Sequence, residues 1–417
     1  MTTFEAPRGM RDFYPEDMVW RTRIFDAWRV AAERHGFRRY DACVVESLEL
    51  LQRKSGEEVS EQIYAFEDKS GRKLALRPEM TPTLARMVAA RQTRLPFPIK
   101  WYAIAQCFRY ERMTRGRKRE HYQLNMDIIG SKDVLCEAEV LAAAVDAMRA
   151  MGLPDNAWRI HVSSRALLGE LLARSGIPEA QHPAVFIALD KRGKISDEEI
   201  ASLLRAEGLA DTAVAKTFEL LAVTTLEEAS ALAGQESPAL ADLRALFALA
   251  ETMGFAGLLQ FDISVIRGLS YYTGIVFEAF DAQRKFRAIF GGGRYDSLLA
   301  LVGGQPTPAV GMGFGDVVVG EVLRDLLGEE CPVERAGYAV GYMEPAQRDA
   351  AVRLASRLRA EGHAVDLALL PQKPKHFFSK AGASAVRHAI FLGPDDLASG
   401  IAQAKDLVTR TAEPVNL

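Results

Sequence analysis

The sequence predicts an α+β protein in which helices flank an antiparallel sheet, followed by a smaller α/β domain. Three observations predict this fold class. Residues 101–111 and 121–130 mix aromatic and aliphatic side chains on either side of a turn at Thr114–Gly116, as two antiparallel strands do. Ala- and Leu-rich helical segments fill residues 164–258, and strands alternate with helices after residue 335.

The composition is that of an ordinary globular enzyme. The chain has 417 residues, of which 48% are hydrophobic and 26% charged, a length that allows roughly two to four domains. The formal net charge is −3, so any contact with a nucleic acid must depend on local basic surface.

Cysteine usage and hydropathy predict a cytoplasmic protein that does not contact a membrane. The four cysteines are scattered without a C-x-x-C pair, and the seven histidines do not cluster with them. We therefore expect no zinc site and no other protein-held metal, with the thiols free in a reducing compartment. We find no signal-peptide core and no apolar run of membrane-spanning length.

The N-terminal third predicts a helix, a strand and a hairpin. Trp20, Ile24, Trp28 and Ala31 recur at helical spacing within residues 15–35, and Gly36 ends that helix. Residues 37–46 then predict one strand. Residues 64–68 and 73–77 predict two strands joined by a turn at residues 70–71, and a helix begins near Thr81.

The stretch 108–130 carries the strongest chemical signal. Six of the eleven residues from Arg109 to Arg119 are basic. Strand alternation predicts that Arg109 and Glu111 share one face, and that Gln123, Asn125 and Asp127 share another. Such a polar face is costly to bury without partners, which a polyphosphate would supply. A solvated basic hairpin tip is an equally open interpretation.

The remaining elements follow in order. We expect a helix at 133–151, a strand at 260–266, a glycine-rich turn at 290–296 that is not a Walker loop, and a strand entering a helix at 308–318. Residues 326–334 are the expected linker. Beyond it we expect strands at 337–342, 364–369, 387–392 and 404–408 around a helix at 345–361.

Three blocks together resemble the histidyl-tRNA synthetases. FRYERMTRGRKREHYQ (108–123) is similar to their form of class II motif 2, and LRPEMTPTLARMV (76–88) and RGLSYYTGIVFE (267–278) follow the family in order and content. Residues 8–12 resemble the family's opening, and 15–46 resemble motif 1, which implies a homodimer. The resemblance implies a class II catalytic domain over 1–327, with the helical insertion at about 164–258, and an anticodon-binding-like domain over 335–417.

The same resemblance implies a site for each substrate. The implied substrates are ATP with Mg²⁺, L-histidine and tRNA(His). Arg109 and Arg267 are implied as the catalytic pair on the α-phosphate. ATP would further contact Glu111, Arg117 and His121. Histidine would be bound by Glu79 and Thr81 at its amino group and by Asp127 and Tyr272 at the imidazole, with Gln123 and Tyr271 completing the wall.

Five positions depart from the family pattern. Motif 3 ends in Asp316-Val317, so the arginine that normally lies over adenine is missing, and His121 stands where many members have an adenine-stacking phenylalanine. Both changes resemble a plastid and cyanobacterial subgroup. Cys43 replaces a proline in motif 1, and Ser270 an aspartate. A non-catalytic, histidine-sensing regulatory subunit of ATP phosphoribosyltransferase and a ligase that loads histidine onto another acceptor remain alternatives.

Overall fold

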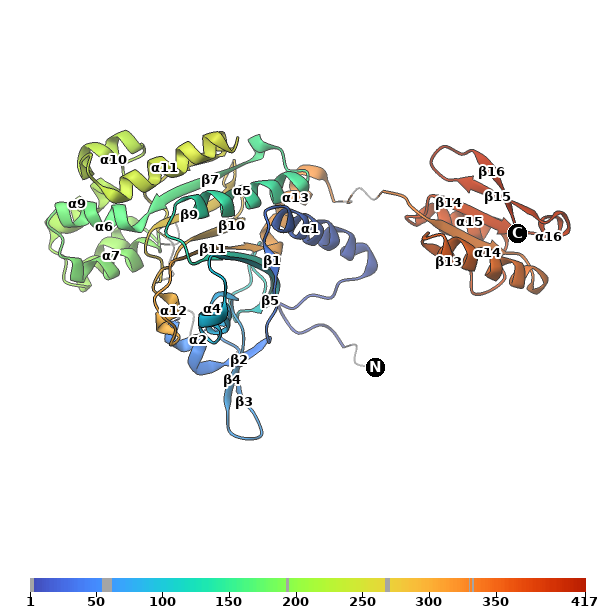
Figure 1. Cartoon of the computed structure of the whole chain (residues 1–417), viewed down its shortest axis with the longest axis horizontal. Helices are drawn as coiled ribbons and strands as arrows, with labels where there is room; N and C mark the ends of the chain where they lie inside the picture. The colour runs from blue at the N-terminus through green and yellow to red at the C-terminus, as the bar shows by residue number, and fades with distance from the viewer. Residues whose placement is uncertain (1–3, 55–61, 193–194, 267–270, 330, 332–333) are drawn as a thin grey trace. The chain divides into compact units, whose positions relative to one another are not determined.

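The structure, a computed structural model, describes residues 4–54, 62–192, 195–266, 271–329, 331 and 334–417. The chain forms two compact units, Met1–Glu330 and Cys331–Leu417, each of which is described by itself (Figure 1).

An eight-stranded sheet organises the first unit. Its strands follow the spatial order β1 (Arg38–Arg39), β5 (Ile99–Phe108), β6 (Glu120–Ile129), β11 (Ala309–Gly315), β10 (Phe290–Arg294), β9 (Ile275–Asp281), β7 (Trp158–Ser164) and β8 (Leu259–Phe261). The two outermost pairs are parallel and all other pairs are antiparallel. The predicted fold class, an antiparallel sheet with flanking helices, is confirmed.

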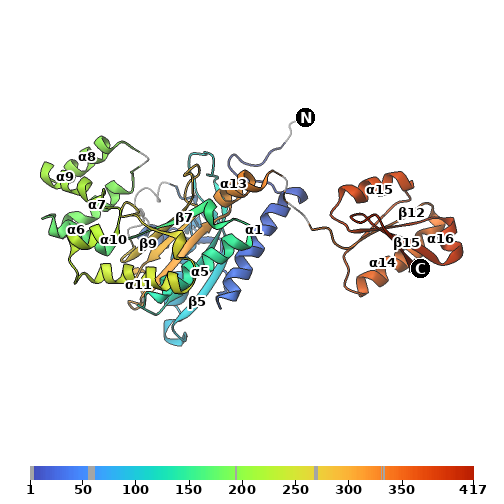
Figure 2. The same ribbon diagram turned by 90° about the horizontal axis from the view of Figure 1, so that it is seen from above.

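Three helices cover one face of this sheet: α1 (Pro15–Arg34), α5 (Leu135–Ala150) and α13 (Asp316–Leu327) (Figures 1 and 2). Helix α1 begins with proline at its first position and buries Trp20, Ile24 and Trp28, as its spacing predicts. At its end, His35 Nε2 lies 3.1 Å from Asp146 Oδ2 of α5.

The predicted strand at 37–46 is instead two strands. Residues 38–39 join the large sheet, whereas β2 (Val45–Ser47) joins a small sheet with β4 (Lys73–Leu76) and β3 (Ala65–Glu67). Between them the buried Arg77 guanidinium donates to the carbonyls of Ala42 and Cys43, at 3.0 and 3.3 Å. Because Arg77 takes these carbonyls, the segment cannot continue a regular ladder. Helices α2 (Leu48–Lys54) and α4 (Thr81–Ala89) complete this region.

The glycine-rich segment 290–296, expected as a turn, is mostly the central strand β10. It pairs with β9 on one side and β11 on the other. Pairing on both sides overrides the weak strand preference of glycine. The strand predicted at 260–266 ends at Phe261 instead, because Asp262 accepts hydrogen bonds from the Ser264 backbone and hydroxyl and forms a turn.

The described residues of the segment 164–258 form six α-helices, in agreement with its Ala- and Leu-rich composition. They are α6 (Arg165–Arg174), α7 (His182–Leu189), α8 (Asp197–Ala206), α9 (Asp211–Leu220), α10 (Leu226–Ala233) and α11 (Pro238–Thr252). Hydroxyl side chains cap several of these N-termini; Ser164, for example, accepts from Leu167 N at 3.2 Å. Short 3-10 turns stand at Gln92–Arg94, Asp155–Ala157, Glu179–Gln181, Ala256–Leu258 and Pro345–Gln347.

The second unit is a mixed sheet with helices. Its strands run in the order β13 (Val365–Leu367), β12 (Tyr338–Tyr342), β14 (His388–Leu392), β15 (Ile401–Asp406) and β16 (Ala412–Asn416). The helices are α14 (Arg348–Ala360), α15 (Pro374–Ala383) and α16 (Pro394–Ser399). Helix α15 was not expected in the lysine-rich segment; it forms because Phe377 and Ala381 pack on Ala339 and Ala389 of the sheet.

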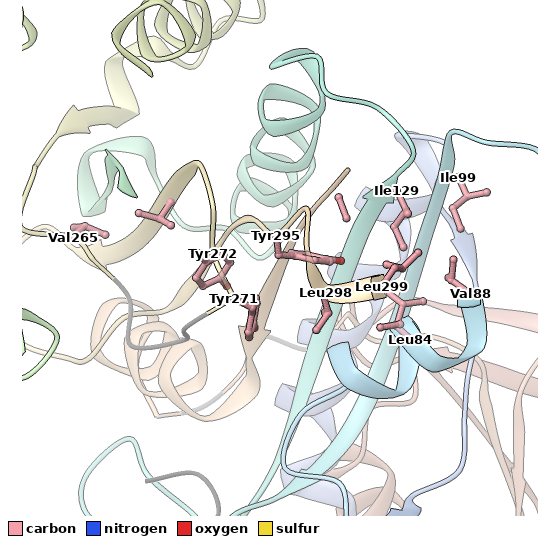
Figure 3. Close-up of a cluster of buried hydrophobic side chains, with 13 residues drawn as sticks. Leu84, Val88, Ile99, Ile129, Val265, Tyr271, Tyr272, Tyr295, Leu298 and Leu299 are labelled. Carbon is pink, nitrogen blue, oxygen red and sulfur yellow. The ribbon is translucent and has the colours of Figure 1, made fainter. Parts of the chain in front are cut away.

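A buried cluster in the first unit supports one end of the large sheet. Leu84 and Val88 of α4 and Leu298 and Leu299 of α12 (Leu298–Leu301) belong to it (Figure 3). Tyr271, Tyr272 and Tyr295 complete the cluster, and each of these tyrosines also lines the cavity described below. The apolar cluster therefore holds the tyrosine rings in place.

Candidate active site

The basic hairpin joins β5 and β6, but Arg109 and Glu111 lie beyond the end of β5. The predicted shared strand face of these two residues is therefore wrong. After Phe108 the backbone bends, because Tyr110 N donates to Gln62 O at 2.7 Å and Glu111 N donates to Arg109 O at 2.9 Å. The predicted turn at Thr114–Gly116 is present.

The bent path still brings the charged side chains together. Glu111 accepts from Arg117 Nε at 2.8 Å, and one of its oxygens lies 3.8 Å from Arg109 Nη1. Arg109 Nε also donates to the carbonyl of Pro78 at 3.0 Å. Glu111 thus bridges the two arginines that the sequence assigned to ATP.

The N-terminal loop ties this hairpin to the start of α13. Arg11 forms a 2.8 Å ion pair with Asp316, whose other oxygen accepts from Tyr122 N at 2.8 Å. Burial raises the pKa of Asp316, and the Arg11 charge opposes that rise. In the described residues, Asp316 therefore connects α13 to β6 and the loop, whereas its neighbour Val317 lines the cavity.

Two adjoining cavities open over the sheet, and they share Arg109, Gln123, Gly291 and Gly313 in their walls. The larger cavity has a volume of about 350 Å³ and the smaller about 40 Å³. Ligand sites commonly span about 300 to 1,000 Å³, so the larger cavity is of ligand-binding size, and the smaller is a narrow polar extension of it.

The smaller cavity is lined by all six residues that the sequence assigned to histidine: Glu79, Thr81, Gln123, Asp127, Tyr271 and Tyr272. Gln123, Asn125 and Asp127 of β6 all face it, as strand alternation predicts. The Tyr295 hydroxyl donates to Asp127 Oδ1. Burial, then the Asp127 charge, raises the pKa of Tyr295 well above its ordinary value, so Tyr295 stays a donor.

Tyr271, Tyr272 and Tyr295, which Figure 3 shows as part of the buried cluster, also line the smaller cavity. The ring centroids of Tyr271 and Tyr272 are 4.8 Å apart in a tilted arrangement, and Tyr271 meets Tyr295 edge-on at 5.9 Å. These ring contacts fix the orientations of the three side chains.

Two glycines of β11 make room for the polar side chains of β6. A Cβ at Gly311 would lie 1.9 Å from Asp127 Oδ1, and one at Gly313 would lie 2.5 Å from Gln123 Nε2. Any larger residue there would displace the groups that line the cavity. The smaller cavity therefore requires glycine at alternate positions of β11, so that the side chains of β6 have room.

The larger cavity collects cations and an aromatic ring. Arg109, Arg117, Lys118 and Arg287 line it together with His121, Val317 and three carboxylates, Glu111, Asp190 and Glu278. Burial lowers the pKa of His121 to about 3, with Arg109 and Arg11 adding to the effect. The His121 ring is therefore neutral at physiological pH and offers an uncharged aromatic face.

Some site residues differ from the sequence-based set. Arg267 lies outside the described residues. Tyr295, Lys118 and Arg287 line the cavities but were not assigned to a substrate. Tyr295 lies within the glycine-rich segment 290–296, which could have drawn attention to it. Arg287 is one of several charged residues between β9 and β10 and carries no local signal.

In the described part of the chain, no group of three or more histidine, cysteine, aspartate or glutamate side chains could hold a metal ion. No helix among the described residues has both the length and the apolar character needed to cross a membrane.

Known proteins resemble this chain along its whole length. A family profile described as Histidyl-tRNA synthetase matches residues 9–315. A chloroplastic/mitochondrial histidine–tRNA ligase of Arabidopsis thaliana is 43% identical over 406 residues, 96% of this chain and 82% of that protein. A histidine–tRNA ligase of Opitutus terrae is 39% identical, covering 100% and 96% of the two chains. The crystal structure of a histidyl-tRNA synthetase from Nostoc sp. superposes with a TM-score of 0.83 at 22% identity, covering 100% and 97%.

Proposed function

The chain belongs to the histidyl-tRNA synthetase family, and we propose that it activates L-histidine with ATP and transfers the histidyl group to tRNA(His). One observation carries this proposal. Arg109 lines both the small polar cavity and the larger cationic cavity, so it stands where an amino acid and a nucleotide would meet.

Activation needs positioning and charge neutralisation. A carboxylate oxygen of histidine attacks the α-phosphorus of ATP, the bond to the β-phosphate oxygen breaks, and histidyl-adenylate and pyrophosphate form. Arg109 would hold the α-phosphate as charge builds on its oxygens in the transition state. Arg267 would act on the same phosphate, a role that depends on the family resemblance alone.

Histidine would be recognised by its two ends. Glu79 and Thr81, both buried at the start of α4, would bind the ammonium group. Asp127, oriented by the Tyr295 hydroxyl, would accept from the imidazole N–H, and Tyr272 would pair with the other nitrogen. Amino acids that leave these buried polar groups unpaired would be rejected.

The nucleotide would occupy the larger cavity. Arg117 would contact the γ-phosphate, Glu111 would accept from the adenine amine, and His121 would lie against the base. Glu278 in the cavity wall would offer carboxylate oxygens to a Mg²⁺ ion bound with ATP, and that ion would neutralise phosphate charge.

In the second step the terminal ribose hydroxyl of tRNA attacks the acyl carbon of the adenylate, and AMP leaves. The resemblance to motif 1 supports a homodimer, and the cysteine pattern supports a cytoplasmic location. We further propose a catalytic domain over 1–327 and an anticodon-binding domain over 335–417, a division close to the boundary at Glu330.

Two assays on the full chain test this function. We expect histidine-dependent ATP–pyrophosphate exchange, and then histidylation of tRNA(His). Failure of both, with the protein folded, would favour the regulatory-subunit alternative. Exchange without transfer to tRNA would favour a ligase with another acceptor.

A further inference from the structure

Arg287 lines the larger cavity but has no role in the proposed function. It lies on the connection between β9 and β10 and lines the larger cavity with Arg109 and Arg117. Among the described residues it makes no hydrogen bond and no ion pair, although Arg117 is bound to Glu111 and Arg109 to Pro78. Its side chain is exposed at the cavity wall, where partial desolvation and the Arg117 charge lower its pKa and the Glu111 and Glu278 charges oppose that shift. The guanidinium is therefore accessible to a ligand in the larger cavity.

Arg287 and Val317 stand at the same end of the strand pair β10–β11. Phe290 at the start of β10 pairs with Phe314 near the end of β11, and these strands are antiparallel. Arg287 precedes β10, and Val317 follows β11 in the first turn of α13. Both Arg287 and Val317 line the larger cavity, so an arginine on either segment would line it too.

The neighbouring walls suit a planar base. Gly291, Gly313 and Gly315 expose flat backbone in the cavity, Ala288 and Val318 add small apolar surface, and the neutral His121 ring lies in the same cavity. Arg109, Arg117 and Lys118 already provide cations for phosphate groups. A planar guanidinium stacks well on an aromatic face, which neither valine nor lysine does as well.

We propose that Arg287 packs its guanidinium on the adenine of bound ATP, supplying from the β9–β10 connection the contact that Val317 cannot make from α13. This inference rests on the proposed function, because it assumes that ATP is the nucleotide. Arg287 is a binding residue and takes no part in bond making or breaking.

The test is Arg287→Ala in the full-length protein. We expect the KM for ATP in pyrophosphate exchange to rise about tenfold, with little change in kcat or in the KM for histidine. Adenosine and inorganic tripolyphosphate, used as competitors of ATP, separate base from phosphate. The inhibition constant of adenosine should weaken with the variant, and that of tripolyphosphate should not change.

Two further variants sharpen the result. Lys285→Ala removes a cation from the same connection that pairs with Asp325 and does not line the cavity, so its KM for ATP should equal the wild-type value. Val317→Arg in the Arg287→Ala background should restore ATP binding, because residue 317 lines the same cavity.

Three outcomes would overturn the inference: an unchanged KM for ATP in Arg287→Ala, weakened inhibition by tripolyphosphate alone, or an equal effect of Lys285→Ala. If the wild type shows no exchange, the proposed function fails instead. Calorimetric titration of ATP then still compares the wild type with Arg287→Ala.

Discussion

The two adjoining cavities are built on different physical principles. In the smaller cavity, buried polar groups bind one another, as Tyr295 binds Asp127, and the packing of β11 against β6 leaves no room for a side chain at Gly311 or Gly313. The larger cavity is open and lined by long flexible cations, including Arg117 and Arg287. A rigid polar pocket discriminates between the side chains of different substrates. In a cationic cavity with flexible side chains, by contrast, the same charge can be provided from more than one segment of the protein. Substitutions should therefore be costly in the first and compensable in the second.

The largest expected effect is that of Asp127→Ala. Removing the carboxylate leaves the imidazole N–H and the Tyr295 hydroxyl without their acceptor, so histidine-dependent exchange should fall by about 10⁴-fold. ATP binding, measured by calorimetry, should remain. Asp349→Ala, at an exposed site on α14, is the control. Near-normal exchange by Asp127→Ala would refute the assignment.

Arg109 belongs to both cavities, so its loss should affect both substrates. Arg109→Ala should lower kcat of exchange by about 10² to 10³-fold, because the group meets charge that develops in the transition state. Arg109→Lys should recover little, since a point charge does not replace a planar fork. The control is Arg115→Ala in the same hairpin, where the side chain is 62% exposed and pairs with Glu321. A kcat loss as large in Arg115→Ala would contradict a specific role for Arg109.

Gly311→Ala tests the rigidity of the smaller cavity alone. The added Cβ would overlap Asp127 Oδ1, so the KM for histidine should rise about ten- to hundredfold while the KM for ATP stays constant. Gly257→Ala adds the same methyl group where nothing lies within 4 Å, and serves as the control. A parallel rise in both KM values would mean that the two cavities are not separable.

The smallest expected effect is a change in the pH dependence of stability. The unfolded His121 binds a proton near pH 6.5, whereas in the folded protein its pKa is about 3. Between these values the unfolded state holds the extra proton, so this group lowers the free energy of unfolding as pH falls. In this pH range, His121→Phe should reduce the slope of the free energy of unfolding against pH by up to about 1.4 kcal/mol per pH unit. Urea unfolding at about pH 5 and about pH 7 measures the slope, and an identical slope in both proteins would exclude a buried neutral His121.

Several residues could be predicted because their neighbours lie close in the sequence. The face shared by Gln123, Asn125 and Asp127 follows from the two-residue period of a strand, and Trp20 and Trp28 follow from the helical period. The backbone path at Arg109 and Glu111 could not be predicted from this periodicity. The bend after Phe108 depends on a hydrogen bond to the carbonyl of Gln62, which lies far from it in sequence.

Local pattern, together with the family resemblance it carries, determined the fold class, the order of most elements and six of the residues that line the smaller cavity. Only the tertiary structure made residues 290–294 a central strand, paired Asp316 with Arg11 in an ion pair, and placed Arg287 in the same cavity as Val317. The reason is physical: side-chain periodicity is a property of neighbouring residues, whereas strand partners and cavity walls come from segments that meet only after the sheet has formed.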